Sequence, residues 1–371
     1  MEKVKLGEYV NIKTGKLDAN TSDINGKYPF FTCSKEPLLI NNYSYDCESV
    51  LVAGNGNLNV KYYNGKFDAY QRTYIIESKD KQILNTKYLY YLINSRIGKL
   101  RRDSIGGVIK YIKLGNLTNI EFLLLGMSEQ SKIVRILDEI QLIIDIRKKQ
   151  IGELDELIKS QFVEMFGNPV LNEKEFETVK LRECLSSIDN GKSFICENFS
   201  RNDECPAILK LSAVTYGNFN QDENKVLIDK KMFIPKCEVH KGDLLFTRKN
   251  TPDLVGMSAF VYETKPHLMM PDIIFRINTF NNCNKIYLWQ LINHTYFRNN
   301  IKLISNGSAK SMSNISKEKL MNLKIILPPI ELQNQFADIV RQIDKQKFEI
   351  QKGLEEMKKL QENLMNKYFG G

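Results

Sequence analysis

The chain has 371 residues, of which 42% are hydrophobic and 26% are charged, with a formal net charge of +9. This balance is typical of globular proteins and excludes a wholly disordered chain, and the length suffices for two or three domains. The longest apolar runs, such as Phe122–Met127, are far too short to span a bilayer, and the first residues lack a signal-peptide pattern. We therefore expect a soluble cytoplasmic protein.

The positive charge lies in two separate parts of the chain. Lys and Arg outnumber Asp and Glu by 18 to 12 in residues 1–127 and by 22 to 17 in residues 168–328. The corresponding numbers are 6 to 8 in residues 128–167 and 7 to 7 in residues 329–371. A polyanion bound at two points would explain this distribution, and so would a basic surface that only keeps the protein soluble.

The first part of the chain predicts a mixed α/β domain. Runs of β-branched and aromatic residues predict short strands at Val50–Ala53, Val60–Tyr63 and Thr73–Ile76. A helix is expected over Tyr88–Arg102, and a glycine loop follows at Ser104–Lys110. The residues of this helix that should face inward are Leu89, Leu92, Ile93 and Leu100.

Residues 128–167 and 329–371 each carry a sustained 4–3 apolar repeat, which is the seam of a coiled coil. A helix of about 39 residues, roughly 58 Å long, needs a partner along its length. We expect the two helices to pair with each other, antiparallel, along a seam made of Leu137, Ile140, Ile144, Ile151, Leu154, Ile158, Val340, Ile343, Ile350, Leu354, Met357 and Leu364. Four polar residues interrupt the repeat and are suited to select the register, namely Arg147, Gln161, Lys347 and Gln361.

The second part of the chain repeats the plan of the first. Strands are expected at Leu244–Thr247, Ala259–Tyr262 and Asp272–Ile277, followed by a helix over Tyr287–Ile304 with Leu288, Leu291 and Ile292 inward. Four stretches recur in order, which indicates an internal pseudo-twofold repeat. They are Val4–Lys16 with Val179–Lys192, Tyr88–Ser95 with Tyr287–His294, Leu117–Phe122 with Leu320–Ile325, and Phe166-Gly167 with Phe369-Gly370.

Patterns for metal, cofactor or nucleophilic chemistry are weak. The seven cysteines never form C-x-x-C, and His240, His267 and His294 lie far apart, so neither a disulfide framework, a zinc site nor a histidine-based catalytic set is expected. The catalytic tetrapeptide of DNA methyltransferases is absent, because Pro328-Pro329 is preceded by Leu and followed by Ile. We expect no cofactor.

One pattern in the second part of the chain allows a catalytic alternative. Pro252-Asp253 followed by Glu263-Thr264-Lys265 fits the loose Pro-Asp…Glu-x-Lys pattern of metal-dependent nucleases. The pattern is short and occurs often by chance. We therefore favour DNA binding without catalysis.

Candidate DNA-binding residues lie on loops of both charged parts. Arg pairs with guanine, Asn and Gln pair with adenine, and Lys and Ser hold phosphates. The candidates in the first part are Gln71, Arg72, Arg101, Arg102, Lys110 and Tyr111, and those in the second are Arg248, Lys249, Asn250, Thr251, Ser308, Lys310 and Ser311.

Three stretches give the chain a resemblance to a known family. They are GSAKSMSNISKEKLMNLKIILPPIELQNQFADIV at Gly307–Val340, KGDLLFTRKNTPDLVGMSAFV at Lys241–Val261, and VLVAGNGNLNVKYYNGKFDAYQRTYII at Val50–Ile76. Together they resemble the DNA-specificity (S) subunit of Type I restriction–modification systems, over essentially the whole chain. The first copy departs from the family pattern at Leu123–Gln130, which has Gly-Met where Pro-Pro is usual.

The resemblance implies an α+β, non-catalytic protein. Two mixed α/β target-recognition domains, at residues 1–127 and 168–328, would be joined by antiparallel spacer helices at residues 128–167 and 329–371. Each domain would bind one half of a bipartite, asymmetric double-stranded DNA site. The helices would dock two methyltransferase (M) subunits, which bring S-adenosylmethionine and methylate adenine, and in some systems restriction (R) subunits join.

Two further functions remain open at this point. The chain resembles the specificity region of fused methyltransferase–nuclease enzymes as well, and a two-lobed protein-interaction scaffold with incidental charge would share its repeat and helices. Co-purification with a separate methyltransferase chain discriminates the first from an S subunit, and salt-dependent DNA binding discriminates the second.

Overall fold

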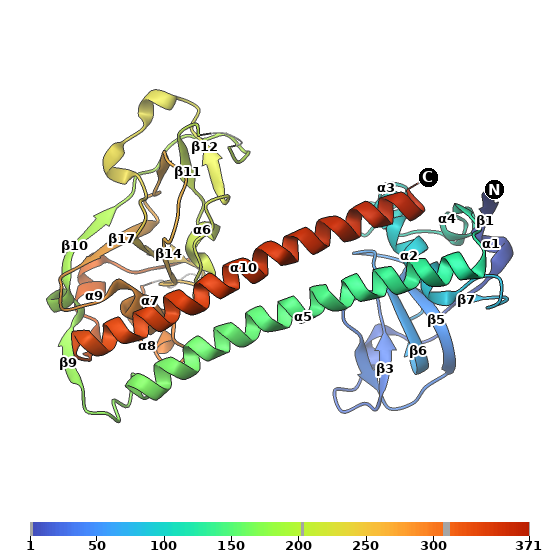
Figure 1. Cartoon of the computed structure of the whole chain (residues 1–371), viewed down its shortest axis with the longest axis horizontal. Helices are drawn as coiled ribbons and strands as arrows, with labels where there is room; N and C mark the ends of the chain where they lie inside the picture. Colours follow the sequence, from blue (N-terminus) through green and yellow to red (C-terminus); the bar gives the residue numbers. More distant parts are fainter. Residues whose placement is uncertain (1–2, 202–203, 307–311, 371) are drawn as a thin grey trace. The chain divides into compact units, whose positions relative to one another are not determined.

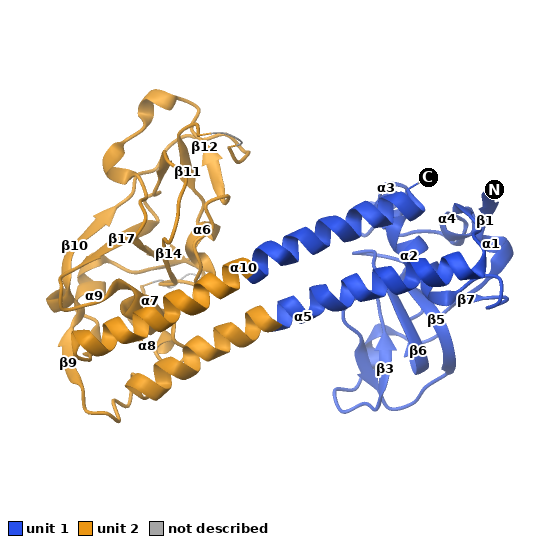
Figure 2. Ribbon diagram, viewed as in Figure 1, with its two compact units in different colours: residues 1–149, 350–371 blue, residues 150–349 orange. Residues whose placement is uncertain are grey.

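The computed structural model describes residues 3–201, 204–306 and 312–370 and divides into two compact units (Figure 2). Unit 1 comprises residues 1–149 and 350–371, and unit 2 comprises residues 150–349. Two helices have 40 residues each, α5 (Met127–Phe166) and α10 (Ile330–Phe369). The first part of α5 and the last part of α10 belong to unit 1, and the remaining parts of both helices belong to unit 2. The long helices predicted from the heptad pattern are therefore present.

Unit 1 is built on a six-stranded sheet with the order β2-β7-β5-β6-β3-β4, in which only β3 and β6 run parallel (Figure 1). Helix α2 packs on β5, β6 and β7, and β1 pairs with β8 just before α5. The bounds are β1 Lys3–Lys5, α1 Leu6–Tyr9, β2 Val10–Thr14, β3 Tyr28–Phe31, β4 Leu38–Ile40, β5 Tyr45–Ala53, β6 Val60–Ala69, β7 Thr73–Ser78, α2 Thr86–Ser95, α3 Ile97–Arg102, α4 Leu114–Thr118 and β8 Glu121–Leu123.

Unit 2 follows the same plan with its sheet in two pieces, ordered β10-β17-β13-β15 and β12-β11-β16. Strands β15 and β16 share the role of β6, because β15 pairs with β13 and β16 runs parallel to β11. The bounds are β9 Glu177–Lys180, β10 Leu185–Asn190, β11 Ala207–Leu209, α6 Ser212–Thr215, β12 Asn224–Val226, β13 Leu244–Thr247, β14 Lys249–Asn250, β15 Ser258–Phe260, β16 Leu268–Met269, β17 Ile274–Thr279, α7 Lys285–Asn293, α8 Arg298–Leu303, β18 Ser313–Asn314, α9 Lys317–Met321 and β19 Lys324–Leu327.

The helices predicted over Tyr88–Arg102 and Tyr287–Ile304 are each broken in two, so the prediction of single helices is wrong. In unit 1 the break falls at Arg96, between α2 and α3, where the Ser95 hydroxyl donates to Leu92 O at 2.7 Å. In unit 2, His294 is extended, and the Asn293 side chain is held by Ser258. The contact of Asn293 with Ser258 is tertiary, and contacts of this kind leave no trace in the apolar period of the sequence.

A buried glutamine anchors the start of each long helix. In unit 1, Gln130 is 0% exposed; its side-chain oxygen accepts from Asn85 N at 2.9 Å, and its amide donates to Ile83 O and Leu125 O, both at 2.8 Å. Asn85 is in turn the N-cap of α2. One side chain therefore fixes the helix start, the approach to it and the start of α2.

The same arrangement is present in unit 2. Gln333 is 0% exposed, accepts from Asn284 N at 2.9 Å, and donates to Asn282 O at 3.1 Å and Pro328 O at 2.7 Å. Asn284 is the N-cap of α7. The glutamine network is thus present in both units, although Leu125-Gly126 precede α5 where Pro328-Pro329 precede α10.

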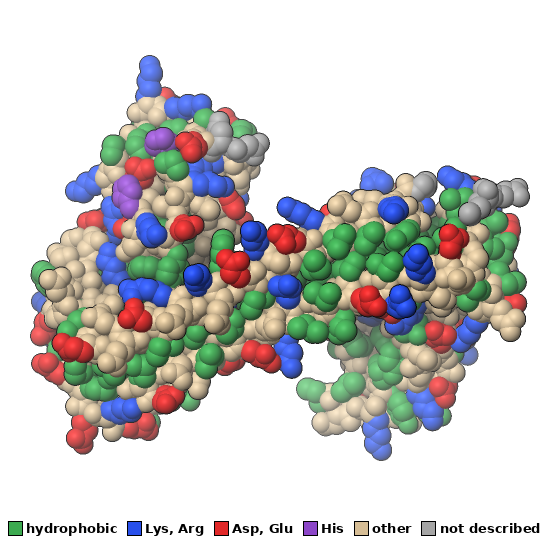
Figure 3. Space-filling model, in the orientation of Figure 1, with side chains coloured by type: hydrophobic (Ala, Val, Ile, Leu, Met, Phe, Trp, Pro, Cys, Tyr) green, Lys and Arg blue, Asp and Glu red, His purple; other side chains and the backbone are tan. Residues whose placement is uncertain are grey.

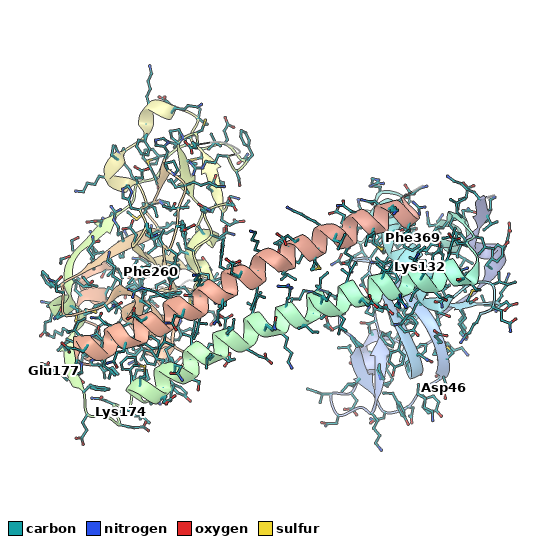
Figure 4. The ribbon with its side chains drawn as sticks, viewed as in Figure 1. Asp46, Lys132, Lys174, Glu177, Phe260 and Phe369 are labelled. Carbon is teal, nitrogen blue, oxygen red and sulfur yellow. The ribbon has the colours of Figure 1, made fainter. Side chains whose placement is uncertain are left out.

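The C-terminal end of each long helix makes a matching aromatic contact. In unit 1, Phe369 at the end of α10, labelled in Figure 4, packs on Tyr88 with ring centroids 5.1 Å apart. In unit 2, Phe166 at the end of α5 packs on Tyr287 at 5.0 Å. Gly167 then closes α5 in the left-handed region (φ +71°), as its sequence position predicts.

Within each unit the two helices run antiparallel. In unit 1, Gln361 donates to Gln141 at 3.0 Å, and a Cβ at Gly353 would lie 2.6 Å from the Arg147 guanidinium. In unit 2, Lys347 pairs with Asp155 at 2.5 Å. The fourth interruption, Gln161, bonds instead to Glu164 of its own helix. The predicted seam residues are all buried or half-buried.

No helix in the described ranges is long and apolar enough to cross a membrane.

We predict that Gln333→Ala lowers the free energy of unfolding by about 2–4 kcal/mol, because it leaves an N–H and two carbonyls buried without their partner. Gln130→Ala should have a similar effect. The control is Gln351→Ala on the exposed face of α10, which should change stability by less than about 0.5 kcal/mol. Urea unfolding followed by circular dichroism measures these differences, and equal losses for Gln333→Ala and Gln351→Ala would contradict the anchoring role.

Candidate nucleic-acid interface

A short hairpin forms the centre of the candidate interface in unit 1. Ile105 and Tyr111 exchange both backbone N–H···O bonds, at 3.0 and 2.8 Å, and so close the glycine loop predicted from the sequence. Gly106 has φ +115°, and a Cβ there would lie 2.4 Å from Ile109 O. The hairpin therefore requires glycine at this position and has a defined shape.

The hairpin lies on the loop that follows β5. Gly56 N donates to Lys110 O and Ile112 N donates to Gly54 O, both at 2.9 Å. Gly54 N in turn donates to Arg72 O at 2.7 Å, in the turn between β6 and β7. Three segments that are distant in the sequence are thus joined by backbone hydrogen bonds, and they bring together the candidates Arg72, Lys110 and Tyr111.

The remaining candidates of unit 1 flank this cluster. Arg101 lies in α3 and donates to Leu58 O at 2.8 Å and to the Asn57 side chain at 3.2 Å, so it supports the loop after β5. Gln71 donates to the Asp18 carboxylate at 2.6 Å. Arg102 and Lys110 are exposed, as are Gln71, Arg72 and Arg101, and Tyr111 is 40% exposed.

Unit 2 holds the counterpart of this hairpin. Asn306 and Asn314 exchange backbone hydrogen bonds at 2.8 and 2.9 Å. Strand β18 pairs with β14, where Lys249 lies opposite Asn314, and Ile315 N donates to Arg248 O at 2.8 Å. The candidates Ser308, Lys310 and Ser311 lie outside the described residues.

The other candidates of unit 2 differ in accessibility. Arg248 is half-buried: its guanidinium donates twice to the Asn314 side chain at 3.3 Å and lies 5.0 Å from the centre of the Phe275 ring. Lys249 is half-buried and Thr251 is exposed. Asn250 is only 5% exposed, because its amide donates to the Thr215 hydroxyl at 3.1 Å. Asn250 therefore supports the loop and does not present its side chain to solvent.

The sequence did not predict three residues that support the candidate interface. The Tyr74 hydroxyl donates to Ile112 O at 3.1 Å, and burial raises its pKa. Arg298 donates to Val255 O at 2.6 Å and Gly256 O at 2.9 Å and so fixes the loop after β14. Asn314 could have been predicted, because it lies in the stretch Gly307–Val340 that resembles the family. The sequence contains no comparable signal for Tyr74 or Arg298.

Two charged residues of the nuclease pattern form separate ion pairs with other residues. Asp253 pairs with Lys302 at 2.9 Å, and this ammonium holds the pKa of the Asp253 carboxyl below its ordinary value. Lys265 pairs with Asp222 at 3.0 Å. In the part of the chain that the structure describes, no group of three or more His, Cys, Asp or Glu could hold a metal ion.

Charge is mixed on one face of the molecule. On the face drawn in Figure 3, Lys and Arg side chains are interspersed with Asp and Glu over both units. Residues 96–113, by contrast, contain six Lys or Arg and one Asp. The hairpin of unit 1 therefore lies within a locally basic segment.

Comparison with known proteins gives one family for the whole chain. The family model described as "Type I restriction modification DNA specificity domain" matches residues 1–156 and 173–358. The chain is 28% identical to the Type I restriction enzyme EcoDI specificity subunit of Escherichia coli over 404 residues, which cover 99% of this chain and 87% of that protein. It is 24% identical to the MjaVIII specificity subunit of Methanocaldococcus jannaschii, over 100% of this chain and 92% of that protein.

A solved structure shares the fold. The chain resembles the S subunit of a Type I restriction–modification system from M. genitalium, with a TM-score of 0.65 and 16% identity over 99% of this chain and 96% of that one. The mixed α/β class and the family predicted from the sequence are thus confirmed. The chain belongs to the Type I restriction modification DNA specificity domain family, whose members are non-catalytic subunits that confer DNA sequence specificity on restriction–modification complexes.

Proposed function

We propose that the chain binds a bipartite, asymmetric double-stranded DNA site, one half with each unit. The observation that carries this proposal is the shared hairpin-on-loop arrangement. In unit 1 a hairpin closed by Ile105 and Tyr111 lies on the loop after β5, and in unit 2 one closed by Asn306 and Asn314 lies on the loop after β13. Two copies of one binding surface within one chain favour two contacts on one DNA molecule.

The two surfaces carry different side chains on the same frame, which supports an asymmetric site. Gly54 and Tyr111 of unit 1 stand where Arg248 and Asn314 stand in unit 2, as the matching hydrogen bonds show. Arg248 and Asn314 form a hydrogen-bonded side-chain pair at this place in unit 2, whereas Gly54 in unit 1 offers no side chain. The two half-sites should therefore differ in sequence.

The proposed division of labour within the chain has four parts. Residues 1–127 and 168–328 are the target-recognition domains, and residues 128–167 and 329–371 are spacer helices that form an antiparallel coiled coil. Its polar contacts are specific: Lys347 with Asp155, Gln361 with Gln141, and Arg147 over Gly353. A glycine within a helix costs about 1 kcal/mol, so its place opposite Arg147 favours a role in setting the register.

The helices are also the proposed docking surface for two methyltransferase subunits. Figure 3 shows hydrophobic side chains grouped over the helical part of unit 1, and the exposed apolar residues there include Leu142, Ile143, Ile146 and Leu360. A hollow of about 340 Å³ lies beside them, lined by Asn85, Ser131, Val134, Arg135, Asp138, Glu139 and Leu142. Exposed apolar surface of this kind is typical of protein–protein contacts. The methyltransferase subunits would supply S-adenosylmethionine chemistry, and restriction subunits would join in systems that cut DNA.

We predict that exchanging residues 1–127 for the first domain of another specificity subunit changes one half-site and leaves the other intact. Methylome sequencing of a strain that carries the exchanged chain with its methyltransferase measures this. A change in both halves, or in neither, would show that residues 1–127 do not act as an independent binding domain.

We predict that Lys110→Gln weakens DNA binding by the complex with its methyltransferase and reduces the slope of log K against log salt by about 1, because one phosphate contact is lost. The matched control is Lys27→Gln, an exposed lysine in the loop before β3. If the slope is unchanged for both variants, Lys110 is not part of the interface. If the unaltered complex binds DNA with an affinity that does not depend on salt, the scaffold function is favoured.

We predict that cysteines introduced together as Gln141→Cys and Gln361→Cys are linked within one chain by a short bismaleimide. The matched control combines Gln141→Cys with Lys345→Cys, which a parallel pair would bring together. Peptide mapping by mass spectrometry identifies the linked residues among the native cysteines. Linkage of the control pair instead would overturn the antiparallel arrangement.

A further inference from the structure

The tip of the unit 1 hairpin presents two apolar side chains to solvent. Val108 is fully exposed, and Ile109 is 63% exposed. Exposed β-branched side chains contribute nothing to folding, since they bury no surface. Single exposed apolar residues are common, but here two adjacent ones stand at the outermost point of a closed turn.

The backbone that carries Val108 and Ile109 is held in a defined conformation. Ile105 and Tyr111 close the turn, and Gly106 gives its backbone room beside Ile109 O. The side behind the tip is tied down by Gly56 N donating to Lys110 O and by the Tyr74 hydroxyl donating to Ile112 O. A tip supported in this way can place its side chains against a partner at little entropic cost.

The surroundings of the tip favour a polyanion as that partner. The exposed cations Arg101, Arg102 and Lys110 flank it, within a segment that has six Lys or Arg against one Asp. A protein partner with an apolar patch would not require this charge, whereas a nucleic acid would. The tip therefore combines two apolar side chains with a cationic border.

The chemistry of the DNA grooves then selects the target of the tip. The major groove admits a two-stranded β-ribbon, and the apolar group that it displays is the C5-methyl of thymine. The minor groove is narrower and displays no methyl group. A two-stranded turn with apolar residues at its end matches the first groove.

We propose that Val108 and Ile109 contact thymine methyl groups in the major groove of the half-site bound by unit 1 and so act as specificity determinants. The inference rests on the proposed DNA-binding function. It concerns the first half-site alone, since the corresponding loop of unit 2, residues 307–311, lies outside the described residues.

A double-mutant cycle tests the proposal. The DNA is a duplex carrying the site found by methylome sequencing, in which each thymine of the first half-site, on either strand, is replaced in turn by deoxyuridine. This removes one methyl group and keeps base pairing. We expect the complex with its methyltransferase to bind about fourfold more weakly at one or two of these positions, as loss of one buried methyl predicts.

The variant protein combines Val108→Ser and Ile109→Ser, and its complex should bind the thymine and deoxyuridine duplexes equally at those positions. The matched control is Ile24→Ser, which alters another highly exposed isoleucine (91%) in a loop of unit 1 and should keep the full discrimination.

Several results would overturn the inference. They are a first half-site in which no deoxyuridine weakens binding, and discrimination that persists in the double variant. A double variant that no longer assembles with the methyltransferase would assign the tip to a protein contact and would also overturn the inference. Failure of the unaltered complex to bind the duplex at all is a separate outcome, which would overturn the proposed function and this inference with it.

Discussion

The buried glutamine at the start of each long helix is the contact on which the rest of each unit depends. Gln130 and Gln333 each join three backbone groups, and one of those groups belongs to the N-cap residue of the helix that packs on the sheet. No water can replace a lost partner of a buried amide, so breaking one of these hydrogen bonds leaves a polar group buried without a partner. The three segments are therefore held together cooperatively. The glutamine therefore joins the start of the long helix to the segment that leads into the helix packed on the sheet.

This frame explains how one plan can serve two different binding surfaces. The networks and aromatic contacts that hold the helices are the same in both units, down to Phe369 on Tyr88 and Phe166 on Tyr287. The hairpins and the loops beneath them match in their backbone hydrogen bonds but differ in their side chains. Under the proposed function, stability resides in the shared contacts and specificity in the hairpins and loops, which could then vary without loss of the fold.

The sequence predicted those features that have a strong period or a repeated motif. The long helices, the strands around Val50–Ala53 and Leu244–Thr247, and the family followed from heptads, alternation and quoted motifs. It did not predict the helix breaks at Arg96 and His294, and at the second break the side chain of Asn293 is held by a tertiary contact with Ser258. Asn250 was predicted to bind a base, because its residue type does not show that its side chain is buried. The supporting role of Arg298 was not predicted, because its carbonyl partners lie more than forty positions away in the chain. Candidates grouped by sequence proximity were therefore a mixture of loop supports and accessible side chains.

The central claim is that two separate surfaces bind two separate halves of one site. Its most direct test is a complete single-base-pair substitution scan of the methylome-defined site, with the affinity of the complex measured for every duplex at constant salt. We expect two blocks of sensitive positions with different sequences, in which each mismatch costs about 1–3 kcal/mol, separated by a gap of fixed length whose substitutions cost little. A single uninterrupted block of sensitive positions, or two blocks of identical sequence, would contradict it.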